Sequence, residues 1–404
     1  MRTYIGLALL LTGIFTGSSV VNADPPIVRT PLKVILYPLV PAKDAYFRQV
    51  EAAFEERYPT IDLQLVDLSA NYYDEDSPDA VTNTFADVIE LDSVFLEDFV
   101  ATGRVRELPG AAIRPAGTFL SVAEQAVTLK GKMYGVPHWV CSNFLFSTAA
   151  DPSSAKSLQD LRREIGEPHK VDKGLLIDLK GRSTLGEWYL DSLLDRHKSL
   201  QAASAFLSES TADKAVYADL INIRALCDSD LCRHDRYHNA PGFYPVQFAR
   251  HRGRILAGYS EGLYYIGMED LTKCREGECL SLGQIKIGPL PLSDAGSQSF
   301  AWVDSFVVAR SCSGGCLSAA EAFLTFMSDA SNVRDTLIPG YSEAPRYLLP
   351  ALKSLYADGA LLAVAPLYAT FYPLIEKAIP VRTRHLNQQL RAIGSTLDRS
   401  VLPK

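Results

Sequence analysis

The sequence predicts an α/β protein of two lobes with a central cleft, and three observations support this prediction. The chain has 404 residues, more than one hydrophobic core usually serves, so two domains are expected. Strand-like and helix-like segments alternate near the N-terminus, which is typical of a mostly parallel sheet covered by helices. Apolar residues make up 47% of the chain, a fraction that suits a packed globular protein and not a disordered one.

The N-terminus has the features of a secretory signal. Arg2 precedes an apolar run from Ile5 to Phe15, and small residues follow up to Ala23. A membrane anchor is the alternative, but a spanning helix needs about 20 apolar residues and this run is shorter. We therefore predict a signal peptide over 1–23 that is cleaved near Ala23, and a secreted (extracellular or periplasmic) protein.

The first lobe opens with three strand-like runs and two helical ones. Alternating or continuous apolar residues define the strands, and apolar residues three and four positions apart define the helices. Pro59 ends the first helix, because proline disfavours helical geometry at the residue before it. The expected elements in chain order are a strand at 32–37, a helix at 44–58, a strand at 61–66, a strand at 85–91 and a helix from about Ser93.

The rest of the chain continues this mixture of strands and helices. Thr184 and Glu187 have the spacing of a capping box at the start of a helix. We predict a first lobe made of 24–140 plus about 303–345 and a second made of 141–302 plus about 346–404. The further expected elements are extended segments within 132–146, strands at 175–178, 254–259 and 300–309, a helix at 319–327 and helices between 344 and 397.

The charge of the chain argues against two classes of partner. The formal net charge is −7 and there is no long basic run, which makes nucleic acid a poor candidate. No segment after the N-terminal run is long and apolar enough to span a bilayer. An acidic protein of this kind is compatible with a cationic small ligand.

Six of the seven cysteines fall into close pairs. In an oxidising compartment each pair can close a small local disulfide, whereas zinc binding is less expected because the spacings are not CxxC. Cys141 is left without a partner. Such a cysteine is a buried apolar residue, an intermolecular link or a reactive thiol. The expected disulfides are Cys227–Cys232, Cys274–Cys279 and Cys312–Cys316.

Cys141 and Glu261 are the candidates for chemistry. Cys141 ends a predicted strand, and a thiol needs a base to become a nucleophilic thiolate. His138 lies three residues earlier on an extended segment, so its side chain should point to the opposite face, and we interpret it as a packing residue. Glu261 follows a strand and lies between small residues and aromatics, where burial would raise its pKa towards that of a general base. The alternative is that Glu261 is an exposed surface carboxylate.

Two further acids lie beside apolar strands. Asp92 follows the strand at 85–91, and Asp304 lies within the apolar strand at 300–309. A buried carboxylate needs a partner, which is either a ligand with amine or cationic groups or the backbone N–H groups around it. Aromatic side chains that can stack on a planar cationic ligand are Tyr37, Trp139, Tyr259 and Trp302, although most aromatics are core residues.

Standard catalytic signatures are absent from the sequence. We find no GxSxG, HExxH, P-loop or GxGxxG pattern. His234 and His238 are four residues apart but are expected on a loop, so we predict no metal site.

Two segments of the chain resemble those of a known family. The run from Val136 to Phe146 (VPHWVCSNFLF), together with GYSE at Gly258–Glu261, is similar to active-site segments of thiaminase I, or thiamine pyridinylase. Weaker support comes from Ile89–Asp92, Ser183–Leu185 and Asp304–Phe306. That family is related in fold to type II periplasmic binding proteins, so the resemblance implies this two-lobed architecture.

The resemblance implies a mechanism and a set of site residues. The family's nucleophile maps to Cys141 and its base to Glu261, while Asp92, Asp304 and Tyr37 map to the pocket of the pyrimidine ring. The thiolate adds to the aminopyrimidine of thiamine, the thiazole leaves, and an organic base or thiol then takes over the pyrimidine. No metal or organic cofactor is needed. The expected partners are thiamine and such a nucleophile, and the protein is expected to be a monomer.

Two other functions are compatible with the same pattern. A secreted receptor for thiamine or a similar cation would share the fold, but it has no use for an unpaired cysteine at the cleft. A cysteine hydrolase would need a nearby histidine and an oxyanion hole, which the sequence does not offer. We rank the transferase first and the hydrolase last.

Overall fold

The computed structural model describes most of the chain. The described residues are 28–68, 73, 86–109, 118–148, 152–165, 174–227, 231–232, 240–275, 277–340 and 342–401. The predicted signal peptide at 1–23 lies outside them, as do His234 and His238. None of the helices within these ranges is long and apolar enough to cross a membrane.

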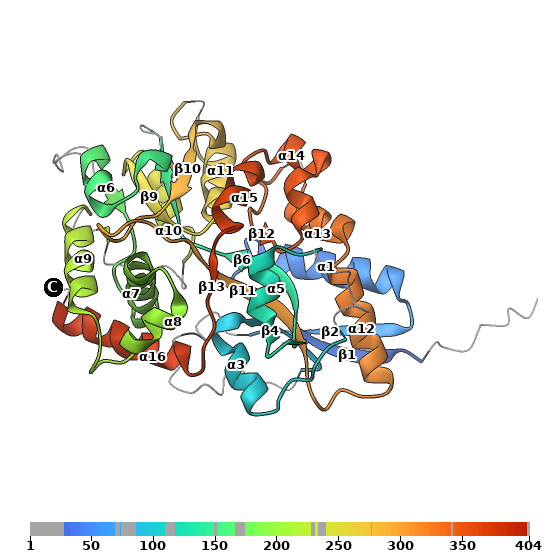
Figure 1. Cartoon of the computed structure of the whole chain (residues 1–404). Coiled ribbons are helices and arrows are strands. Elements are labelled where there is room, and N and C mark those ends of the chain that lie inside the picture. The colour runs from blue at the N-terminus through green and yellow to red at the C-terminus, as the bar shows by residue number, and fades with distance from the viewer. Residues whose placement is uncertain are drawn as a thin grey trace, which may run out of the picture.

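A larger sheet forms the core of the lobe that carries the first strand, β1 (Figure 1). Its strand order is β12-β6-β11-β3-β1-β2, and β13 also pairs with β11. β1 runs parallel to β2 and β3, whereas β11 runs antiparallel to β3 and β6. The strands are β1 (Thr30–Ile35), β2 (Ile61–Val66), β3 (Val88–Asp92), β6 (Val136–Cys141), β11 (Phe300–Val308), β12 (Leu349–Pro350) and β13 (Ile379–Pro380).

Helices cover this sheet and bury its apolar side chains. The ring of Phe54 on α1 packs edge-on against Phe323 and Phe326 of α12, with centroids 5.3 and 5.4 Å apart. Contacts of this kind bury large apolar areas and dominate the stability of a lobe. The elements around the sheet are α1 (Lys43–Arg57), α3 (Ser93–Ala101), α5 (Ser121–Val127), the hairpin β4 (Thr128–Leu129) and β5 (Lys132–Met133), α12 (Gly315–Met327), α13 (Ala330–Leu337), η4 (Lys353–Ala357), α14 (Gly359–Val364) and α15 (Tyr368–Ile375).

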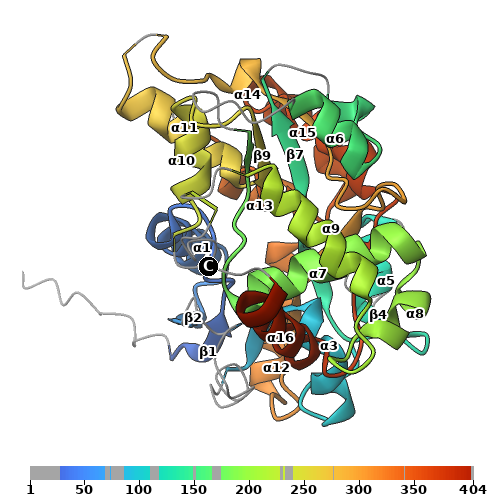
Figure 2. The same cartoon turned by 90° about the vertical axis from the view of Figure 1, so that its left-hand side faces the viewer.

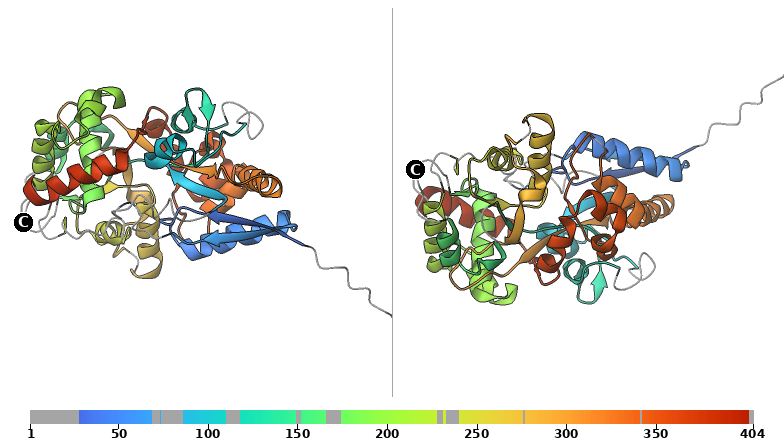
Figure 3. Two further views of the ribbon diagram at one scale, coloured as in Figure 1. Left: turned by 90° about the horizontal axis from the view of Figure 1, so that it is seen from below. Right: turned by 90° about the horizontal axis from the view of Figure 1, so that it is seen from above.

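A smaller sheet forms the second lobe, with the order β10-β7-β9-β8. Its strands are β7 (Phe144–Ser147), β8 (Leu175–Leu176), β9 (Ile255–Gly258) and β10 (Lys286–Pro289). The helices of this part are α6 (Leu158–Ile165), α7 (Arg182–His197), α8 (Leu200–Ala203), α9 (Lys214–Ala225), α10 (Phe243–Ala249) and α11 (Gly262–Thr272), with short turns η1 (Pro152–Ser154), η2 (Ser204–Phe206) and η3 (Leu282–Gln284). The views from below and above show the two halves side by side (Figure 3).

Two segments link the two sheets, next to the candidate active site that is described below. β6 passes into β7 through Ser142 and Asn143 alone, and β10 leads back towards β11. Phe300–Trp302, β12 and β13 all pair within the larger sheet. The predicted boundaries of the lobes stay a prediction, whereas the two-sheet α/β architecture agrees with the fold class expected from the sequence.

The last long helix, α16 (Leu386–Thr396), returns to the second lobe and lies along α7 (Figure 2). Glycines permit this close approach. A Cβ added at Gly186 would collide with the carbonyl oxygen of Leu390, and one added at Gly394 would collide with that of Arg182. α16 is followed by a short turn, η5 (Leu397–Val401). The contact holds the α16 side chains that face the cleft.

The predicted capping box at Thr184 and Glu187 is wrong. α7 begins at Arg182, Gly181 occupies the N-cap, and no side chain caps the helix. Thr184 and Glu187 therefore lie within the helix, where both are buried. Glu187 instead takes part in the candidate active site, which is described below.

All three predicted disulfides are present, and Cys141 is the free cysteine of the described residues. Each bridge joins cysteines only four or five residues apart, so it stiffens a turn and removes little conformational entropy from the unfolded chain.

We expect one free thiol per chain in the purified protein. Denaturing alkylation without reductant, followed by intact-mass measurement, should add a single label, and the same treatment after reduction should add seven, one for each cysteine of the sequence. Three or more labels without reductant would contradict the disulfide scheme.

Candidate active site

The register of the larger sheet brings the predicted site residues together. Asp92, the last residue of β3, lies directly opposite Asp304 on the neighbouring strand β11. Cys141, the last residue of β6, lies opposite Trp302 on the other side of β11. Three adjacent strands thus present a thiol, two carboxyls and an indole at one place.

A hollow opens in front of these residues. Its empty space, including the open mouth, is about 520 Å³. Five of the residues predicted to form the site line it, namely Tyr37, Asp92, Cys141, Tyr259 and Trp302. The other lining residues are Tyr73, Val94, Ser183, Glu187, Asn387 and Leu390, so α7 and α16 supply one wall. We call this space the thiol hollow.

Glu261 lies in a second, adjoining hollow. This space is lined by Glu261, Tyr37, Tyr259 and mostly apolar residues, and it measures about 480 Å³ with its mouth. Tyr37 and Tyr259 line both hollows and form the boundary between them. Glu261 is near enough to Cys141 to raise the pKa of the thiol by charge repulsion. We call this space the glutamate hollow.

Two predicted residues are placed differently from the others. Trp139 is fully buried and lines neither hollow, because its ring is taken up in the core beside His138, 3.8 Å between centroids. Asp304 is also withdrawn, being only 1% exposed, but its Oδ2 atom lies 3.4 Å from the Sγ atom of Cys141. Asp304 therefore contacts the thiol directly, whereas the Trp139 side chain packs in the core behind the thiol.

Cys141 is held as a neutral thiol in the ligand-free site. Its S–H donates to Asp304, and the side chain is buried. Burial is the main reason why the pKa of the thiol is raised well above its usual range, and the charges of Asp304, Glu261 and Asp92 raise it further. The site therefore becomes reactive only when a base and a compensating positive charge act on the thiol.

The carboxyls around the thiol have raised pKa values for the same reason. Burial raises the pKa of Asp92 to about 6, although hydrogen bonds from the hydroxyl of Tyr73 (2.6 Å) and the backbone N–H of Val94 (2.8 Å) oppose the shift. Burial also raises the pKa of Glu187 and of Glu261 from 4.5 to about 7. Such displaced carboxyls in a hollow are typical of functional sites, and a cationic ligand would stabilise their ionised forms.

Sequence reasoning missed three residues of this site. Glu187 accepts hydrogen bonds from the hydroxyl of Tyr259 (2.6 Å) and the side-chain amide of Asn143 (3.0 Å), and Tyr73 contacts Asp92. The available signal was the row of acids one helical turn apart on α7, Glu187, Asp191 and Asp195, which are all buried. Tyr73, in the polar segment NYYDEDS, carried no comparable signal.

His138 packs away from the thiol, in line with its interpretation as a packing residue. Its Nδ1 atom lies 2.5 Å from Oε1 of Glu90, and both side chains are almost wholly buried. The other oxygen of Glu90 accepts the backbone N–H of Tyr37 at 2.8 Å. The pair therefore holds the residue that separates the two hollows, and it is not placed to deprotonate Cys141.

In the two hollows, as far as the structure describes them, no three acids, histidines or cysteines lie close enough together to share an ion. Among the described residues, the group of acids, histidines and cysteines close enough to share an ion is Asp87, Cys312 and Cys316. Both cysteines of that group form a disulfide, so they do not offer thiolates.

We predict that Asp304→Asn lowers the pKa of Cys141. The ionised carboxylate of Asp304 repels the thiolate, although burial raises the pKa of this carboxyl well above its usual range. Asparagine leaves a neutral amide at the same place, so the thiolate is less disfavoured. The rate of iodoacetamide alkylation of the ligand-free protein at pH 7–8 should rise about tenfold, as expected for a shift of about one pKa unit. A rate equal to that of the wild type would show that Asp304 does not control the thiol.

The buried acids also predict how stability depends on pH. They bind protons more tightly in the folded than in the unfolded chain, so the free energy of unfolding should fall between pH 4.5 and about 7 and then level off. Glu187 and Glu261 each contribute up to about 3 kcal/mol, because one pKa unit corresponds to about 1.4 kcal/mol. Urea unfolding at pH 5 and pH 8 tests this, and equal or greater stability at pH 8 would contradict it.

Comparison with known proteins places the fold and the site in context. No family model matches the chain. A curated protein named thiaminase-1, from Paenibacillus thiaminolyticus, is 27% identical over 384 residues, which is 92% of this chain and 87% of that protein. Clostridium botulinum thiaminase I in complex with thiamin is similar in structure, with a TM-score of 0.76, 24% identity and coverage of 92% of this chain and 100% of the other. Maltose-bound T. maritima MalE3 gives a TM-score of 0.72 at 14% identity, with 92% and 95% covered.

These similarities give first the fold class of the chain and then the family that it resembles within that class. The chain has the two-lobed fold of type II periplasmic solute-binding proteins. Within that class it resembles thiaminase I over most of its length, as the sequence predicted.

Proposed function

We propose that this chain is a thiamine pyridinylase that displaces the thiazole of thiamine with an organic base or thiol. The observation that carries the proposal is the free thiol of Cys141, which lies in a hollow with Asp92 and Glu187 and donates to Asp304. A thiol nucleophile surrounded by buried carboxyls suits a substrate that is a cation and carries an aminopyrimidine. The similarity to thiaminase-1 points to the same reaction.

In the first half of the reaction, Cys141 would form a covalent intermediate. The thiol proton passes to a carboxylate, and Sγ forms a bond to a ring carbon of the aminopyrimidine. The bond between the bridging methylene and the thiazolium nitrogen then breaks with its electron pair on nitrogen, so a neutral thiazole leaves. Covalent catalysis of this kind divides one difficult displacement into two easier steps.

The carboxyls have two roles in this proposal. They bind the positive charge of thiamine, which in turn favours their ionised forms. Once ionised, a carboxylate with a pKa near 7 is well matched to take the thiol proton at neutral pH, and Glu261 is our assignment for that base. The aromatic rings of Tyr37, Tyr259 and Trp302 would hold the planar rings of the substrate.

We also propose that the protein is secreted and acts as a monomer without a metal or organic cofactor. Three disulfides support an oxidising compartment.

The test is to incubate the purified protein with thiamine and aniline and to follow both by mass spectrometry. The proposal predicts loss of thiamine, release of free thiazole and formation of a pyrimidine–aniline product. Intact thiamine with measurable binding would instead support a solute receptor. Absence of both cleavage and binding would contradict the assignment of thiamine as the ligand.

A further inference from the structure

The Cys312–Cys316 bridge lies where β11 leads into α12. Cys312 follows β11 and is buried, whereas Cys316 lies in the first turn of α12 and is partly exposed. The two Cα atoms are 5.4 Å apart, and the guanidinium of Arg106 donates to the carbonyl oxygen of Cys312 at 2.7 Å. The backbone therefore keeps the two sulfur atoms near each other whether or not they are bonded.

The carboxyl of Asp87 stands beside this bridge. Both sulfur atoms and a side-chain oxygen of Asp87 lie within 4.8 Å of one another. The backbone N–H of Asp87 donates to the carbonyl oxygen of Lys33 at 2.8 Å, and its carbonyl oxygen accepts the N–H of Ala309 at 2.9 Å. Its Oδ2 atom also accepts the backbone N–H of Lys33 at 2.9 Å, so the carboxyl is held in place. Asp87 immediately precedes β3 and therefore lies at the opposite end of that strand from Asp92 and the thiol hollow.

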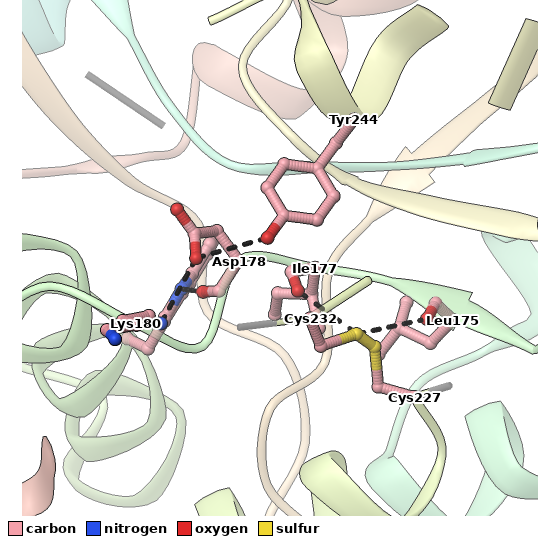
Figure 4. The surroundings of a disulfide bond; sticks show 8 residues. Leu175, Ile177, Asp178, Lys180, Cys227, Cys232 and Tyr244 are labelled. Carbon is pink, nitrogen blue, oxygen red and sulfur yellow. Dashed lines mark hydrogen bonds between the residues drawn. A yellow bond between two sulfur atoms is a disulfide. The ribbon is translucent and has the colours of Figure 1, made fainter. Parts of the chain in front are cut away.

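The Cys227–Cys232 bridge has different surroundings (Figure 4). Its sulfur atoms lie near backbone carbonyl oxygens, 3.8 Å from that of Leu175 and 4.0 Å from that of Ile177. Among the described residues, the group formed by Asp87 and the other bridge is the one in which three acids, histidines or cysteines come close enough to share an ion. The two bridges thus differ in whether a third metal ligand is at hand.

We propose that Cys312 and Cys316, once reduced, bind a Zn²⁺ ion together with Asp87, with water as the fourth ligand. Thiolate sulfur and carboxylate oxygen are ligands that Zn²⁺ prefers, and a tetrahedral site places such atoms about 3.5–3.8 Å apart. The separations within 4.8 Å therefore require only small side-chain rotations. The N-terminus of α12 favours the thiolate form of Cys316. The ion ties the start of α12 to the end of the sheet in the reduced chain, as the bridge does in the oxidised one.

Opening of the bridge needs a reductant, which is a small-molecule thiol. Its thiolate attacks Sγ of Cys316, the more exposed of the two cysteines, and the electron pair of the sulfur–sulfur bond goes to Sγ of Cys312. A second thiolate then attacks the mixed disulfide, and Cys316 leaves as a thiolate. The small thiol is oxidised to its own disulfide, and both cysteines are reduced. Binding of Zn²⁺ releases the two thiol protons, so the affinity rises with pH.

The experiment measures metal binding to the full chain before and after reduction with a small thiol, which is then removed without oxygen. The reduced wild type should bind one Zn²⁺ at this site, and Co²⁺ should give the visible absorption of a tetrahedral thiolate complex. The oxidised protein should bind neither ion there. Cys312→Ser should abolish binding. Asp87→Asn should weaken it about 100-fold, because the loss of even an outer partner of a metal site costs up to about that much.

The double variant Cys227→Ser/Cys232→Ser is the matched control, because it removes the bridge that has no third ligand beside it. This variant should keep the Zn²⁺ affinity of the reduced wild type.

Three results would overturn the site. They are absence of Zn²⁺ binding by the reduced wild type, equal affinity in Asp87→Asn, and equal affinity of the oxidised protein. Where reduction alone unfolds the chain, Zn²⁺ should restore the native circular dichroism of the wild type but not of Cys312→Ser, and restoration in neither or in both would also contradict the site. Thiamine cleavage enters none of these measurements, so this inference is tested separately from the proposed function.

Discussion

Cys141→Ser is expected to lower thiamine cleavage by about four orders of magnitude or more, as the loss of a covalent nucleophile does in other enzymes. A serine hydroxyl is far less acidic than a thiol. The site also disfavours a negative charge at this position, because the side chain is buried and three carboxyls lie near it. Serine is close to cysteine in size and can donate to Asp304 as the thiol does, so the variant should fold. Thiazole release measured with excess aniline gives the rate.

Binding provides the control for this variant. Thiamine affinity measured by calorimetry should stay within about tenfold of the wild type, because the aromatic and carboxyl groups of the thiol hollow are untouched. A wild-type protein mixed with thiamine alone should show a mass increase for the pyrimidine adduct, which the serine variant lacks. Cleavage by the serine variant at a rate near that of the wild type would remove Cys141 from the mechanism.

The elements that the sequence predicted well are those with a strong local pattern. The strand expected at 61–66 is β2 (Ile61–Val66), and the helix expected at 44–58 is α1 (Lys43–Arg57). The alternation or helical spacing of apolar residues involves only residues close together in the sequence. Such a pattern therefore predicts an element without information from the rest of the chain. The three cysteine pairs were predictable for the same reason, since their partners are four or five residues apart.

The site was predictable only where its residues end or follow apolar strands. Asp92 and Cys141 are the last residues of β3 and β6, a position that a strand pattern reveals. Glu187 was instead interpreted as part of a capping box. The residues that donate hydrogen bonds to it, Asn143 and Tyr259, are far away in the chain. No local pattern reports such partners.

Placement within the site also depends on register that the sequence does not show. Asp304 meets the thiol because it stands two positions along β11 from Trp302, which is the partner of Cys141 in the β11–β6 ladder. Trp139 was expected to stack on a planar ligand because its side chain is aromatic. It is buried instead, since β12 and β11 flank it on both sides.

Glu261→Gln is expected to slow turnover by about 10²–10⁴-fold, the usual contribution of a general base. The amide keeps the size of the side chain and its neighbours but cannot accept the thiol proton or the proton of the acceptor. Its effect on the free thiol should have the opposite sign. Removing the negative charge lowers the pKa of Cys141, so alkylation by iodoacetamide should become faster.

This combination separates a base from a group that merely repels the thiolate. Slower thiamine cleavage together with faster alkylation assigns proton transfer to Glu261, and the pH profile of kcat/KM should lose its limb near 7. Asp304→Asn is the matched comparison, because Asp304 is the carboxyl in direct contact with Sγ. Wild-type turnover in Glu261→Gln, with turnover lost in Asp304→Asn, would transfer the role of base to Asp304. Equal losses in both variants would mean that the two carboxyls share the proton between them.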